Sequence, residues 1–136
     1  MAKNPLYTAK ATALISLAKE VERFKEALDQ AELRLDVQSA EEIALRARAI
    51  VHEADTMALP KRLIPAARAI ADAAYLIDQL VSHGLGRAEA SVAVFSIDKY
   101  QEVANYTQKA LEALKLPALY YGADIDALET TGGLYL

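Results

Sequence analysis

Residues 14–35, LISLAKEVERFKEALDQAELRL, decide the fold class because their apolar side chains recur at alternating spacings of three and four. This spacing is the a/d seam of a heptad, which places the apolar side chains along one side of an α-helix. With Pro5 suited to the first helical turn, the pattern predicts a long helix over about 5–36. The seam consists of Leu14, Leu17, Val21, Phe24, Leu28, Ala31 and Leu35.

A capping signal and a proline place two shorter helices after the first one. Ser39 and Glu42 have the spacing of a capping box, in which each side chain accepts a hydrogen bond from the other residue's amide, so a helix is predicted over about 39–57. Pro65 has no N–H to donate to an earlier carbonyl. We therefore expect a bend before Pro65 and a third helix over about 65–83.

The remaining pattern predicts a fourth helix and a tail. Gly84 is suited to the left-handed position that follows a helix, and apolar spacing resumes over about 87–115 until Pro117. Four helices with short connections favour an antiparallel four-helix bundle in the all-α class, with the first and fourth helices long. The prediction is a helical domain over 1–116 and an extended C-terminal docking tail over 117–136.

Composition is that of one folded domain. The chain has 136 residues, 54% of them hydrophobic and 25% charged, with five glycines and four prolines, which excludes a disordered or loop-rich protein. It has no cysteine, so disulfides and thiolate metal sites are excluded and synthesis in a cytoplasm is expected. No uncharged apolar run reaches the length that spans a bilayer, and no membrane association is expected.

The sequence offers no carrier for catalysis. Neither His52 nor His83 lies in a Glu-x-x-His pair, and His52 shares a helix face only with Asp55 among its acidic neighbours. No serine lies in a G-x-S-x-G elbow, and the glycines do not have the spacing of a phosphate-binding loop. We expect a protein that is not an enzyme and that has no catalytic, cofactor-binding or metal-binding residue.

Charge is distributed unevenly along the chain. The net charge is −4, yet residues 46–87 hold six basic and four acidic side chains. The segment after Leu116 holds three acids, Asp124, Asp126 and Glu129, and no base. Lys61 and Arg62 make the predicted bend basic, so the tail and the bend are complementary in charge.

The tail is too apolar for a simple linker. Tyrosines supply a large contact area at a small entropic cost, which suits an interface. Two placements stay open: the tail covers its own bundle, or it docks on another subunit with its acids against a basic surface such as the bend. The predicted partner-binding residues are Tyr120, Tyr121, Asp124, Asp126, Leu134, Tyr135, Leu136, Lys61 and Arg62.

These features predict a structural or adaptor protein that works through protein–protein contacts in a multi-subunit assembly. A tail-to-bend contact between copies would join different patches, so a homo-oligomer built from it would be a ring or a filament. In outline the predicted layout resembles the small helical-bundle connector proteins of viral particles, which extend C-terminal arms onto neighbours. This likeness of architecture implies a virion component and transfers no functional residue.

A DNA-binding regulator is the alternative prediction. Residues 77–95 have two apolar-patterned segments joined by SHGLGR, the short connection of a helix-turn-helix. The second segment offers only Arg87 before alanine, valine and phenylalanine dominate, whereas groove recognition needs several polar side chains and a basic stripe. Nucleic acid is therefore the less favoured partner.

Overall fold

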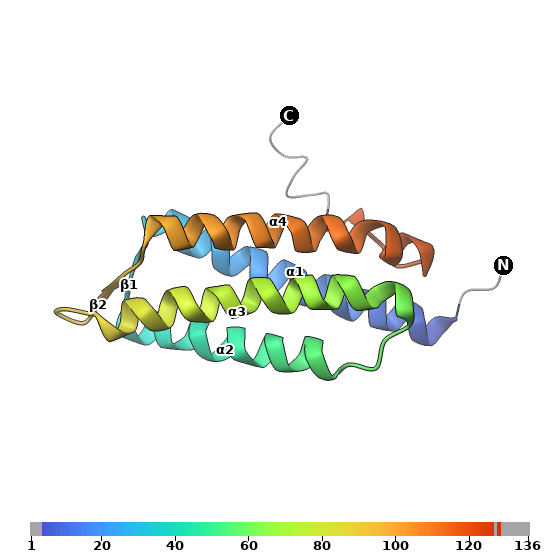
Figure 1. The fold of residues 1–136 in the computed structure, drawn as a ribbon, viewed down its shortest axis with the longest axis horizontal. Helices are drawn as coiled ribbons and strands as arrows, with labels where there is room; N and C mark the ends of the chain where they lie inside the picture. Colours follow the sequence, from blue (N-terminus) through green and yellow to red (C-terminus); the bar gives the residue numbers. More distant parts are fainter. Residues whose placement is uncertain (1–3, 127, 129–136) are drawn as a thin grey trace, which may run out of the picture.

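The structure, a computed structural model, describes residues 4–126 and 128, and it is an all-α four-helix bundle as the sequence predicts (Figure 1). The helices are closer in length than predicted, at 26, 20, 23 and 24 residues. A short two-stranded sheet joins them at one end. The elements are α1 (Pro5–Gln30), β1 (Arg34–Asp36), α2 (Val37–Thr56), the 3-10 turn η1 (Lys61–Leu63), α3 (Ile64–Gly86), β2 (Val92–Val94) and α4 (Ile97–Tyr120).

Helix α3 is the centre of the packing. It contacts α2 and α4 along most of its length, whereas α1 packs mainly on α4 and meets α2 only sparsely. Ala66, Ala73 and Ala74 of α3 are fully buried, and their small side chains allow the neighbouring helices to approach closely. Ile70 and Ile77 of the same helix are fully buried as well. The alanine-rich face is therefore a packing surface inside the bundle.

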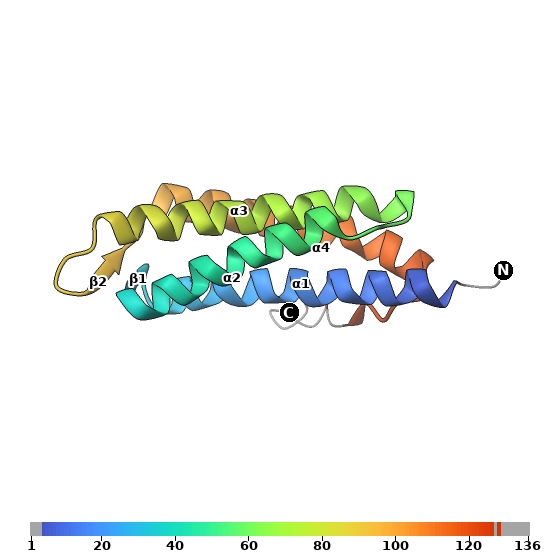
Figure 2. The same cartoon turned by 90° about the horizontal axis from the view of Figure 1, so that it is seen from below.

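The bundle has two different ends (Figures 1 and 2). We call one the sheet end; it holds β1, β2 and the adjoining helix ends, residues 26–42 and 80–102. The other, the bend end, holds the start of α1, the α2–α3 connection with η1, and the end of α4 with the segment that follows it, residues 4–16, 55–68 and 109–126. The two ends are separated by the length of the helices.

The first helix ends six residues before the predicted boundary. Glu32 and Leu33 adopt left-handed backbone angles, with φ of 56° and 61°, and the Leu33 amide donates to the Leu28 carbonyl at 2.9 Å. This hydrogen bond closes the last turn of α1 and reverses the chain into β1. The heptad pattern continues through Leu35 because strand residues also need apolar contacts, so the pattern alone did not show the helix end.

The predicted capping box at Ser39 is wrong. Asp36 is the N-cap of α2: its carboxylate accepts from the Ser39 amide at 3.0 Å and from the Ser39 hydroxyl at 2.8 Å. These hydrogen bonds hold the pKa of Asp36 below its ordinary value, because they favour the ionised form. Ser39 thus lies in the first turn and supports the cap.

Gly84 does not end the third helix. It is buried within α3, which continues to Gly86, and it lies where Phe95 presses against the helix. A Cβ atom at Gly84 would meet the Phe95 ring carbon Cδ1 at 2.4 Å and the Val94 carbonyl oxygen at 3.0 Å. Glycine is needed here for the close approach of a strand and not for a left-handed turn.

The predicted start of the fourth helix at 87 is also wrong, because a tight turn and a strand come first. Glu89 and Val92 exchange two backbone hydrogen bonds, of 3.1 and 3.0 Å, around Ala90 and Ser91. β2 then pairs antiparallel with β1, and α4 begins only after the N-cap Ser96. The second helix of the proposed helix-turn-helix is therefore absent from residues 87–95.

Pro117 lies inside α4, so the predicted boundary between domain and tail at 116/117 falls within a helix. The helix ends at Tyr120, and the chain turns at Gly122, where φ is 81° and the Ala123 amide donates to the Ala118 carbonyl at 3.0 Å. A proline costs one helical hydrogen bond. Ala118, which follows it, is fully buried, and this burial favours continuing the helix across Pro117.

Candidate functional site

Several predicted partner-binding residues meet within one chain at the bend end. The Arg62 guanidinium carbon lies 4.1 Å from the centre of the Tyr120 ring, a cation–π contact. Tyr121 stands edge-on to both Tyr120 and Tyr7, at centroid distances of 5.0 and 5.5 Å. The Thr8 hydroxyl donates to the Tyr121 carbonyl at 2.5 Å. Arg62 and the two tyrosines thus fix the end of α4 onto α1 and η1 of the same molecule.

The predicted tail begins by packing on its own bundle. Ala123 and Leu128 are buried, whereas Asp124 and Asp126 are exposed between them. The Asp124 carboxylate accepts from the Asp126 amide at 2.9 Å. This part of the tail therefore follows the first placement considered above and still presents its acids to solvent. The other predicted residues, Leu134, Tyr135 and Leu136, lie outside the described part of the chain.

Exposed apolar side chains lie at both ends of the bundle and along its sides. Among the described residues, eleven large apolar side chains are exposed, and eight of them lie at an end. Leu116 and Leu119, exposed by 75% and 51%, share one face of α4 with Tyr120. The bend-end set is Leu6, Ile64, Leu116, Leu119 and Tyr120; the sheet-end set is Val92, Val94 and Ile97; Leu45, Tyr75 and Tyr106 lie along the sides. Both ends therefore offer apolar surface for a contact with another protein.

The two ends also differ in charge. Nine acidic and three basic side chains lie at the sheet end, whereas six basic and four acidic ones lie at the bend end, in the ranges defined above. The sheet-end acids are Glu26, Asp29, Glu32, Asp36, Glu41, Glu42, Glu89, Asp98 and Glu102. The bend-end bases are Lys10, Lys61, Arg62, Arg68, Lys109 and Lys115. The molecule thus has opposite net charges at its two ends.

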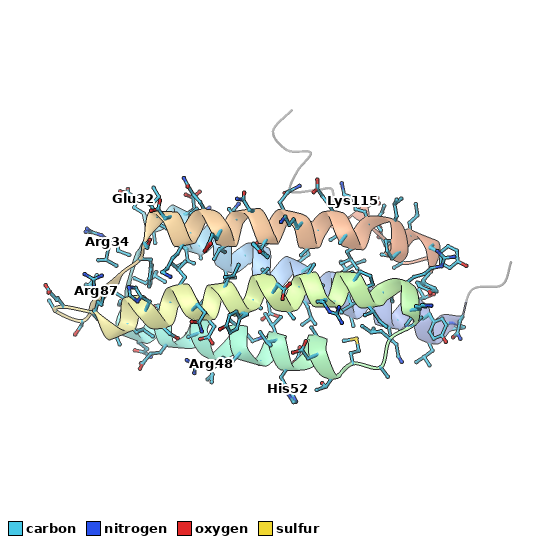
Figure 3. The ribbon with its side chains drawn as sticks, viewed as in Figure 1. Glu32, Arg34, Arg48, His52, Arg87 and Lys115 are labelled. Atoms are coloured by element: carbon cyan, nitrogen blue, oxygen red, sulfur yellow. The ribbon has the colours of Figure 1, made fainter. Side chains whose placement is uncertain are left out.

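A pocket of about 650 Å³ opens at the sheet end within this acidic surface. Arg34 of β1 and Arg87 after α3 both line it, and Figure 3 shows the two side chains at this end. His83 adds a third basic group, and Val94 and Phe95 form an apolar wall. The sequence pattern does not indicate this pocket, because it predicts a helix at Arg34. Only the pairing of Arg34 with Val94 in the sheet brings Arg34 to Arg87.

A second pocket, of about 540 Å³, lies between α1 and α2, where the two helices meet only sparsely. An ion-pair network crosses it: the Arg46 guanidinium donates to both carboxylate oxygens of Glu20, at 2.5 and 2.7 Å, and to Glu53 at 3.3 Å. The hydrogen bonds from Arg46 lower the pKa of Glu20, and those from Glu20 raise the pKa of Arg46. The network ties α1 to α2 and accounts for the polar groups in this groove.

Metal-ligating side chains do not cluster in residues 4–126 and 128. Those residues contain no group of three or more histidine, cysteine, aspartate or glutamate side chains able to hold a metal ion. His52 lies on the exposed face of α2 (Figure 3). Burial raises the pKa of the Tyr100 phenol, and the nearby carboxylates Asp29 and Glu26 raise it further, which keeps that phenol protonated. None of the described helices has an apolar stretch long enough to cross a membrane.

Comparison of the chain with protein-family models, with curated proteins and with solved structures finds no match.

Proposed function

We propose that the chain is a non-enzymatic structural or adaptor protein, which acts by binding other copies of itself end to end in a multi-subunit assembly. One observation supports the proposal above the others: the two ends of the bundle have opposite net charges, and each end also carries exposed apolar side chains. Both features favour contact between the sheet end of one molecule and the bend end of the next.

Apolar burial and charge would both contribute favourably to such a contact. Burying one leucine side chain that water now covers contributes about 1.5–3 kcal/mol, and each end offers several large apolar side chains. The opposite charges at the two ends increase the rate of encounter and set the relative orientation. Because the joined patches differ, repetition of the contact generates a closed ring or an open filament.

We propose that the protein is made in a cytoplasm and is then incorporated into a viral particle. The connector-like layout of the chain suits an assembly of that kind. The DNA-binding alternative gains no support, because residues 87–95 do not form its second helix and the sheet end is acidic.

The test is the solution mass of the full chain and of two matched variants, measured by light scattering across protein concentration. Leu119→Ser changes an exposed leucine at the bend end, and Leu45→Ser changes one that is exposed on the side of α2. We expect the full chain and Leu45→Ser to form the same oligomer, and Leu119→Ser to dissociate at concentrations about tenfold higher or more. A full chain that stays monomeric at every concentration contradicts end-to-end assembly.

A further inference from the structure

The sheet-end pocket holds two arginine side chains that form no ion pair with any described residue. Arg34 and Arg87 line this one pocket from two different elements. The negative end of the α3 dipole stabilises Arg87 and His83, which lie at the C-terminus of that helix. It does not explain Arg34, which comes from β1 on the other side of the pocket.

The chemistry of the pocket selects a carboxylate next to an apolar group. Guanidinium groups present paired N–H donors that match a carboxylate, and Val94 and Phe95 supply an apolar wall beside them. Glu89 also lines the pocket, and the last carbonyls of α3 lie at the same end. These negative groups disfavour a dianion such as phosphate more than a singly charged carboxylate. An acidic peptide segment is therefore the ligand class that fits.

The bend end carries such a segment. Asp124 is exposed and is followed by the apolar Ile125 and by the exposed Asp126. The buried neighbours Ala123 and Leu128 hold this part of the chain against its own bundle. Asp124 is thus presented on a fixed surface, and a partner does not have to order a free tail before binding it.

We propose that the pocket formed by Arg34 and Arg87 is the receptor for the Asp124–Asp126 segment of a second copy. The inference rests on the proposed end-to-end assembly and names its polar contact. Helix α1 alone, with 26 residues, is about 39 Å long, so pocket and segment lie too far apart to meet within one molecule. The pocket takes the place of the receptor predicted at the bend, because Arg62 at the bend contacts Tyr120 of its own chain.

A charge exchange tests the pairing. The first variant carries Arg34→Glu and Arg87→Glu; the second carries Asp124→Lys and Asp126→Lys. In each variant alone, the pocket and the segment have charges of the same sign and repel each other. We therefore expect its self-association to weaken about tenfold or more. In an equimolar mixture each altered pocket meets an altered segment of opposite charge, and each native pocket meets a native segment. We therefore expect the mixture to recover the oligomer, measured by sedimentation velocity.

The control places an equal change of charge elsewhere, with Arg23→Glu and Lys25→Glu on α1, outside both ends of the bundle; neither residue forms an ion pair with a described residue. We expect this control to associate like the native chain, and circular dichroism to show that all variants are folded. If the native chain assembles but the first variant assembles equally well, or if the mixture does not recover, the pocket is not the receptor while end-to-end assembly stands. If the native chain never assembles, the proposed function fails first.

Discussion

At the residue scale, the two glycines in the last turn of α3 have opposite roles. Gly84 faces the Phe95 ring, whereas a Cβ at Gly86 would meet no atom within 4 Å. We expect Gly84→Ala to lower the free energy of unfolding by about 1–3 kcal/mol, because Phe95 or the helix must move. Gly86→Ala should raise the free energy of unfolding by about 0.5–1 kcal/mol, because alanine restricts the unfolded chain and favours the helix. Urea unfolding of both variants measures the difference, and equal stability would show that β2 does not press on α3.

Residue-scale conformations also explain what the sequence did not predict. Glu32, Leu33, Ala90 and Ser91 all adopt left-handed backbone angles. Such angles are usually signalled by glycine or asparagine, and none of these four positions has either residue. The end of α1 and the turn before β2 were therefore invisible to pattern analysis. The arginine pocket was not predicted for the same reason, because it depends on the sheet that these turns create.

At the element scale, the apolar periodicity correctly predicted the number of helices and the buried face of α1. Leu14, Leu17, Val21 and Leu28 of the predicted seam are buried on α1, and the four-helix arrangement is confirmed. Helix ends were predicted less well because they depend on contacts distant in sequence. The helix continues across Pro117 because Leu114 before it and Ala118 after it are both buried. Gly84 is required by the close approach of Val94, which lies ten residues further along the chain.

The link between α1 and α2 makes a prediction about pH. Arg46 joins the two helices through Glu20, whose folded pKa lies below its ordinary value of 4.5. A lowered folded pKa contributes stability that is complete above pH 4.5 and is lost as the pH falls through the folded value. Since the Arg46 side chain is 38% exposed, Glu20→Gln should cost about 0.5–1 kcal/mol of unfolding free energy at pH 7 and nothing at acid pH.

Chemical unfolding across pH measures this contribution. Glu41→Gln is the matched control, because Glu41 is exposed on the same helix as Arg46 and forms no ion pair with a described residue. The control should follow the native chain at every pH. A Glu20→Gln variant whose deficit persisted unchanged in acid would show that the loss comes from packing and not from the ion pair.

At the scale of the whole molecule, the charge difference between the ends predicts how assembly responds to salt. Electrostatic attraction between exposed charges extends about 10 Å at 0.1 M salt and about 3 Å at 1 M. We expect the association of the full chain, followed by sedimentation velocity, to weaken as sodium chloride rises from low to molar concentration. It should not vanish, because the exposed leucines at the bend end contribute a part that salt does not screen.

A variant with Lys61→Gln and Arg68→Gln retains the contact of Arg62 with Tyr120 but lowers the positive charge of the bend end. Its association should be weaker at low salt and should depend less on salt. Association that is equally strong at every salt concentration would mean that the apolar ends alone hold the copies together, and that the charge difference serves another purpose.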